Sequence, residues 1–184
     1  MQLIIANIHP DVEVQWQLTV SRLNEWIKNY VFSFKWWFLL VLFILCLYAW
    51  WKLTDKSRLS EIILHAGLIL IIILGLDEIG RQLSLWYYTY DLMPLFPPIS
   101  AIDFSCLPVV YSLIYQYFKP WRSFTIATIV MSTVLCFVLE PIFMWSGIYH
   151  TLSWKNYYGF PIYIFIAIII KGVVMKIYGI SKNS

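Results

Sequence analysis

The stretch Phe34–Leu53, FKWWFLLVLFILCLYAWWKL, decides the fold class of this chain. It carries no charge between Lys35 and Lys52, and its side chains there are almost all aliphatic or aromatic. A helix needs about 20 residues, each rising about 1.5 Å, to cross the roughly 30 Å hydrocarbon core of a bilayer. The stretch has that length, so it predicts a transmembrane helix.

Four further segments have a similar character: Leu59–Leu85, Asp103–Phe118, Arg122–Trp145 and Tyr158–Tyr178. Their apolar runs are continuous, whereas the strands of a membrane barrel alternate in polarity. We therefore predict an all-α integral membrane bundle of about five transmembrane helices, forming one domain over residues 34–178. The short Asp103–Phe118 segment contains Pro108, which favours a kinked or partly re-entrant helix.

The composition excludes several other classes of protein. Of the 184 residues, 61% are hydrophobic and 12% are charged, against about 45–50% and about 25% in soluble domains. The net charge is only +3 and the basic residues are scattered, so we expect no nucleic-acid partner. Cys46, Cys106 and Cys136 lie far apart without histidine neighbours, which predicts packed cysteines, no metal site and no cofactor.

Residues 1–33 form a separate amphipathic segment. Between Asp11 and Tyr30, apolar side chains recur at helical spacing while polar side chains fill the opposite side. The apolar series is Trp16, Val20, Leu23, Ile27 and Tyr30. Such a helix is expected to lie in the membrane interface, or alternatively to pack on the loops of the bundle.

The positions of lysine and arginine predict the orientation, because cytoplasmic loops are richer in both. One side of the membrane holds Lys52, Lys56, Arg58, Lys119, Arg122, Lys176 and Lys182, and the other holds Arg22, Lys28, Lys35 and Lys155. We therefore expect a cell-membrane protein with its N-terminus outside. The C-terminus would be cytoplasmic, with residues 179–184 as a short tail.

Four ionisable residues are expected inside the bilayer. Asp77, Glu78 and Arg81 lie in the second span, and Glu140 lies in the fourth. At about 1.5 Å per residue, Arg81 and Glu140 come within about 3 Å of the same depth on the outer side. A charge in hydrocarbon is costly unless it is paired. We therefore predict that Arg81 contacts Glu140 and also pairs with the acids of its own helix.

This acidic level has two open interpretations. It is either a structural clamp between two helices or a site whose surplus negative charge binds a small ligand, a proton or a cation. A ligand pocket would be lined by Trp86, Tyr87, Ser132, Cys136, Trp145 and Tyr149. Two other polar side chains have simpler interpretations. Lys171 is expected to reach toward the inner face, and His65 to form a local hydrogen bond with Glu61.

Several short motifs occur together along the chain. They are Asp77-Glu78-Ile79-Gly80-Arg81, Leu85-Trp86-Tyr87-Tyr88, Asp91-Leu92-Met93-Pro94, Tyr115-Gln116-Tyr117-Phe118, Glu140-Pro141, Gly147-Ile148-Tyr149 and Trp154-Lys155. As a set, over roughly residues 34–178, they resemble a family of small multi-pass membrane proteins from endospore-forming bacteria. The resemblance implies the plasma membrane of a Gram-positive cell, and it implies no activity.

Three functions follow from these features as alternatives. The chain binds or transports a small ligand or ion at the acidic level, or it is an enzyme that acts on a lipid or isoprenoid by carboxyl acid/base chemistry. The third alternative is a structural subunit that binds a partner. Besides the lipid bilayer, the expected partners are a second copy of the chain, as a homo-oligomer, or another membrane protein.

Overall fold

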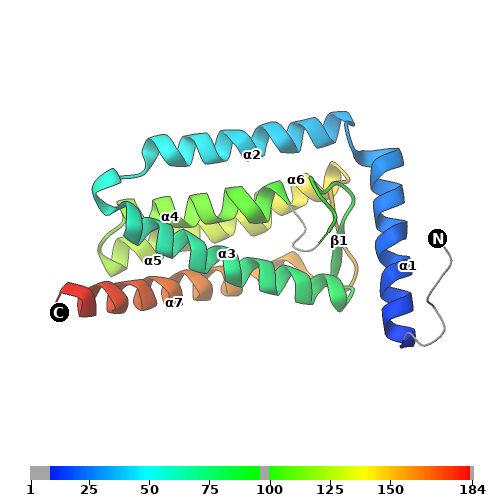
Figure 1. Cartoon of the computed structure of the whole chain (residues 1–184). Helices are drawn as coiled ribbons and strands as arrows, with labels where there is room; N and C mark the ends of the chain where they lie inside the picture. The colour runs from blue at the N-terminus through cyan, green and yellow to red at the C-terminus, as the bar shows by residue number, and fades with distance from the viewer. Residues whose placement is uncertain (1–8, 96–99, 183–184) are drawn as a thin grey trace.

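The computed structural model describes residues 9–95 and 100–182 (Figure 1). Its helical elements are α1 (Pro10–Glu25), η1 (Trp26–Tyr30), α2 (Phe34–Leu53), η2 (Lys56–Arg58), α3 (Leu59–Gln82), η3 (Ile102–Cys106), α4 (Leu107–Tyr117), α5 (Trp121–Val134), η4 (Leu135–Leu139), α6 (Glu140–Trp145) and α7 (Asn156–Lys182). Two short strands, β1 (Trp86–Tyr88) and β2 (Tyr149–Thr151), complete it. The predictions for residues 1–8 and 183–184 lie outside the described residues.

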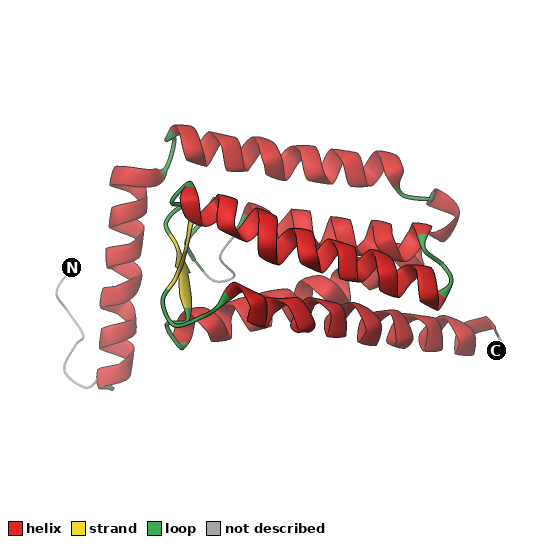
Figure 2. Cartoon of the chain, turned by 180° about the vertical axis from the view of Figure 1, so that it is seen from behind, coloured by secondary structure: helices red, strands yellow, loops and turns green. Residues whose placement is uncertain are grey.

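The helices form an elongated bundle in which α2, α3, α4, α5 and α7 run lengthwise (Figures 1 and 2). Four helices in the described residues are long and apolar enough to cross a membrane: Phe34–Leu53, Lys56–Gln82, Trp121–Trp145 and Asn156–Ile180. The predicted all-α membrane bundle is therefore confirmed. The remaining predicted span, η3 continued by α4, has only 5 and 11 residues, which is about 24 Å at about 1.5 Å per residue, and it is not one of these four.

The core of the bundle lies between α3, α4, α5 and α7. It is built from Ile69, Ile73, Leu107, Tyr111, Tyr115, Phe124, Met131, Ile166, Ala167, Ile170 and Val174. α2 lies outside this core, and Leu39 is its only buried residue. Many apolar side chains of the bundle remain exposed, as expected for helices whose surroundings are lipid.

α1 lies crosswise at the end of the bundle that carries the strands (Figure 1). None of its residues is buried, and the next turn, η1, is attached through the Trp26 indole N–H, which donates to the Asp91 carbonyl oxygen at 2.9 Å. The predicted Asp11–Tyr30 helix is thus present as α1 and η1. Its crosswise direction is the one expected of a helix in the membrane interface.

α3 ends at Gln82, three residues before the predicted Leu85, because Ser84 adopts a left-handed conformation with φ 52°. The N–H groups of Ser84 and Leu85 donate to the carbonyls of Arg81 and Gly80, which is the Schellman closure. α6 ends with the same bond pattern at Gly147, where φ is 69°. β1 and β2 follow these two ends directly and pair antiparallel, so the ribbon ties α3 to α6.

Single π-helical turns precede two prolines of the bundle. η3 leads into Pro108 in the first turn of α4, and η4 leads into Pro141 in α6. A proline lacks its N–H and its ring collides with the carbonyl four residues earlier in an α-helix. The wider π turn makes room for the ring. The segment with Pro108 continues as a helix to Tyr117 after its π turn.

Candidate ligand-binding cavity

Arg81 joins two buried carboxylates at the strand end of α3. Its Nε donates to Asp77 Oδ2 at 2.8 Å, and its Nη1 and Nη2 donate to Asp91 Oδ2 and Oδ1 at 3.0 and 3.1 Å. The ring of Tyr88 covers the guanidinium at 4.4 Å. Burial raises the pKa of the Asp91 carboxyl above its ordinary value, although the Arg81 charge opposes the rise. The pair within α3 was predicted, whereas the Asp91 partner was not.

We call the contacts of Arg81 with Asp77 and Asp91 the clamp, and Trp86 of β1 completes it. Its indole N–H donates to Asp77 Oδ1 at 2.9 Å, so both oxygens of Asp77 are bonded. The indole ring lies directly on Gly80 of α3, where any Cβ would collide with it. A glycine at this position therefore allows the ribbon to fold back onto the helix.

A cavity of about 390 Å³ lies beside the clamp, which is a usual size for a ligand pocket. Its walls come from α3, β1, η3, α4, η4, α6, β2 and α7, with Leu42 from α2. Half of the lining residues are leucine, isoleucine or valine, and five are aromatic with polar edges: Trp86, Tyr88, Tyr149, Trp154 and Tyr163. Three carboxyl groups, those of Asp77, Asp103 and Glu140, also line it. The cavity thus combines apolar walls with a concentration of acid.

Two of these carboxyl groups are incompletely bonded. Asp103 Oδ2 and Glu140 Oε2 are buried and have no hydrogen-bond partner among the described residues. Glu140 Oε1 accepts from the Tyr163 hydroxyl at 2.9 Å, and Asp103 is only 6% exposed. Asp103 lies within the π turn η3 and Glu140 directly follows η4. Such turns are frequent at functional sites, because they redirect a side chain without ending the helix.

The predicted contact between Arg81 and Glu140 is wrong. Arg81 uses its donors on Asp77 and Asp91, and no ion pair of the described residues reaches Glu140. Asp77 and Glu140 nevertheless come together, since both line one cavity. The clamp and the cavity are therefore two adjacent structures.

The other candidate residues divide into two groups. Trp86 and Tyr149 line the cavity, as predicted. Glu78, Tyr87, Ser132, Cys136 and Trp145 are not among the lining residues. Glu78 accepts from the Gln82 amide at 2.8 Å, Tyr87 stacks on His150, and Trp145 is 91% exposed. Ser132 and Cys136 are fully buried inside the bundle instead.

Sequence reasoning missed Asp91, Asp103 and Tyr163. Asp103 carried a usable signal, because it is an acid at the outer end of a predicted span, at the level of Asp77. Asp91 lies in a loop and Tyr163 in an apolar helix, so neither had a distinguishing pattern.

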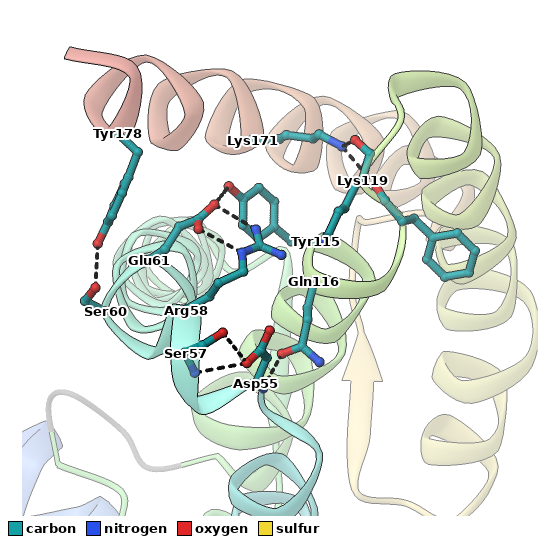
Figure 3. A network of polar contacts seen from close by, with 11 residues as sticks. Asp55, Ser57, Arg58, Ser60, Glu61, Tyr115, Gln116, Lys119, Lys171 and Tyr178 are labelled. Atoms are coloured by element: carbon teal, nitrogen blue, oxygen red, sulfur yellow. Dashed lines mark hydrogen bonds and ion pairs between the residues drawn. The ribbon is translucent and has the colours of Figure 1, made fainter. Parts of the chain in front are cut away.

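A second polar cluster lies at the other end of the bundle (Figure 3). Glu61 accepts two hydrogen bonds from Arg58, at 3.0 and 2.8 Å, and one from the Tyr115 hydroxyl. His65 stacks on Tyr115 with ring centres 4.3 Å apart, and within residues 9–95 and 100–182 neither of its ring nitrogens has a hydrogen-bond partner. The predicted bond between His65 and Glu61 is therefore wrong.

Lys171 of α7 closes the end of the short helix α4 (Figure 3). Its ammonium donates to the carbonyl oxygens of Phe118 and Lys119 at 3.1 and 2.8 Å and lies 4.0 Å from the Phe124 ring centre. The side chain is 1% exposed, so its ammonium group is bound inside the bundle, on the connection after α4. It points toward the end of the bundle that was predicted to be the inner one. A helix that ends early leaves carbonyl oxygens without hydrogen-bond donors, and here the Lys171 ammonium is the donor.

Comparisons with protein families, with curated proteins and with solved structures found no match to this chain. The resemblance to membrane proteins of endospore-forming bacteria therefore stays a prediction.

Proposed function

We propose that this multi-pass membrane protein binds a small organic ammonium ion in the cavity. The observation that carries the proposal is the pair of buried, unpartnered carboxyl oxygens of Asp103 and Glu140 on a largely apolar wall. Burying an uncompensated carboxylate in a poorly solvated place costs several kcal/mol. This cost is large enough that such a group can take up a proton instead. A bound cation would remove that cost.

The walls favour an organic cation over a metal ion. No group of three or more metal-ligating side chains occurs in the described residues. The aromatic rings of Trp86, Tyr149 and Trp154 line the cavity near the acids. Aromatic faces attract quaternary ammonium ions, and the aliphatic walls would hold the apolar part of the ligand.

The test compares benzyltrimethylammonium with neopentylbenzene, which has a carbon in place of the charged nitrogen. Each is dialysed to equilibrium against the protein in nanodiscs, with empty nanodiscs as the reference. We expect retention of the ammonium ion above the reference and none for the neutral compound. Asp103→Asn and Glu140→Gln should each weaken binding about tenfold, which corresponds to about 1.4 kcal/mol.

Glu78→Gln is the matched control, since this acid lies on α3 outside the cavity. It should bind the ammonium ion like the unchanged protein. Circular dichroism of every variant shows whether the fold is kept. Equal retention of the neutral compound, or undiminished binding by the Asp103→Asn, Glu140→Gln double variant, would refute the proposal.

We also propose that the strand end of the bundle, and with it the cavity, faces outward. The support is the cluster of Lys52, Lys56, Arg58, Lys119 and Arg122 at the opposite end, which is the pattern of a cytoplasmic side. Reporter fusions at the two termini test this. An external N-terminus and a cytoplasmic C-terminus are expected, and both termini on one side would contradict it.

A further inference from the structure

α2 is attached to the rest of the bundle at three levels. Near its start, the Trp36 indole N–H donates to the Leu92 carbonyl at 3.3 Å, and near its end the Trp50 indole N–H donates to Ser112 Oγ at 2.9 Å. At the level between them, Cys46 Sγ lies 3.0 Å from Cys106 Sγ. The middle attachment of this peripheral helix is thus a pair of thiols.

This thiol pair differs from ordinary packed cysteine. A disulfide has its sulfur atoms about 2.05 Å apart, so a shift of about 1 Å would bring these two to bonding distance. Cys46 and Cys106 are both partly exposed, whereas Cys136 is fully buried. Cys106 also lines the cavity, which gives a small reagent a route to its sulfur. The two helices are far apart in sequence, so a bond here would cross-link the bundle.

We propose that Cys46 and Cys106 form a reversible thiol–disulfide modification site that fixes α2 to the cavity wall. The reaction partner is a small-molecule disulfide. One cysteine thiolate attacks it to give a mixed disulfide and releases one thiol, and the second cysteine then displaces the other thiol. The protein loses two protons and two electrons, and the reagent is reduced to two thiols. Any excess of small thiols reverses the exchange.

The bond would affect the cavity through two neighbours. Leu42 lies one turn before Cys46 on α2, and Asp103 lies three residues before Cys106, and both line the cavity. Oxidation would therefore hold the α2 part of the wall against the segment that carries Asp103. This consequence depends on the proposed ammonium site, whereas the formation of the disulfide does not.

The test treats the reduced protein in nanodiscs with 4,4′-dithiodipyridine, a membrane-permeant aromatic disulfide. We expect two pyridinethione molecules per chain and a mass lower by two hydrogens. Trypsin places the three cysteines in different peptides: residues 36–52, residues 82–122 and residues 123–155. The first two should be linked, and dithiothreitol should separate them.

Single cysteine variants show which thiols form the bond. Cys136→Ser should form the link like the unchanged protein, since this cysteine is not part of the pair. Cys46→Ser should give no link and should retain one pyridyl group on the peptide with Cys106. Pyridyl groups on both peptides of the unchanged protein, a link to residues 123–155, or a link only between chains would overturn the site.

A second measurement follows release of benzyltrimethylammonium before and after oxidation. We expect the dissociation rate to fall about 5-fold or more, within the range of ordinary coupling between sites. A disulfide without any binding of the probe would refute the ammonium proposal and leave the modification site intact. Binding of the probe without a disulfide would refute the modification site and leave the ammonium proposal intact. An unchanged release rate in the oxidised protein would show that the disulfide does not affect the cavity.

Discussion

Replacement of Arg81 by Gln should be among the most destabilising single changes in this protein. The side chains of Arg81, Asp77 and Asp91 are only 16%, 7% and 6% exposed, so the pairs belong to the buried class. Removal of one partner from a buried ion pair costs about 3–5 kcal/mol, because an uncompensated charge is left behind. Here one guanidinium serves two carboxylates through three hydrogen bonds.

The partner is identified by a double-mutant cycle of Arg81→Gln with Asp91→Asn. The free energy of unfolding is measured by SDS titration in mixed micelles, followed by circular dichroism. We expect a coupling of about 1–3 kcal/mol, as found for residues in direct contact. The cycle of Arg81→Gln with Glu140→Gln is the control, and its coupling should stay within about 0.5 kcal/mol because the two side chains share no contact.

The loss should also depend on pH. Burial raises the pKa of Asp91 in the folded protein, and without Arg81 nothing in the clamp opposes that rise. A carboxyl with a raised folded-state pKa stabilises the fold below its unfolded pKa of about 3.9, and this stability is lost as the pH increases. The Arg81→Gln variant should therefore lose more stability at pH 8 than at pH 4. A coupling near zero with Asp91, or a larger coupling with Glu140, would refute the clamp.

Two further predictions concern the packing of the bundle. Gly80→Ala should lower the free energy of unfolding by about 1–3 kcal/mol, since the new methyl group displaces the Trp86 indole. The control Gly75→Ala, on the same helix, has open space around the new methyl group and should be neutral or stabilising by up to about 1 kcal/mol. Equal effects of the two substitutions in the same unfolding assay would contradict this. Lys171→Met should lower the free energy of unfolding by about 1–3 kcal/mol, because the Phe118 and Lys119 carbonyls lose their donor. The control Lys176→Met, on the exposed side of α7, should change it by no more than about 0.5 kcal/mol. A more stable Lys171→Met protein would show that the buried charge destabilises the fold.

Long apolar segments made most of the fold predictable from sequence. Phe34–Leu53 was predicted with the same bounds as α2, because its length and hydropathy leave one solution in lipid. The ribbon of β1 and β2 was not predicted, since strands of three residues are too short to give a periodic pattern. The early end of α3 depends on the left-handed conformation of Ser84. A serine in the sequence does not indicate this conformation, whereas a glycine would.

The candidate site was predicted only in part, for a geometric reason. Counting residues along a helix gives the depth of a side chain but not its direction around the bundle. Asp77 and Glu140 do line one cavity, while the predicted partner of Arg81 was wrong. Asp91 reaches Arg81 because the Schellman turn and β1 fold the chain back over the helix end, and this return path follows from tertiary structure.

The short third predicted span, η3 with α4, would have a consequence for the surrounding lipid. The roughly 24 Å of η3 and α4 falls about 6 Å short of a typical hydrocarbon core, and the connection at Lys119 is strongly polar. Headgroups beside it must dip toward the bilayer centre, at a cost of fractions of a kcal/mol for each Å of mismatch. We therefore expect the membrane next to α4 to be thinner than elsewhere around the molecule. A bilayer of shorter acyl chains would relieve this local deformation, and the protein would gather in the thinner regions of a membrane of uneven thickness.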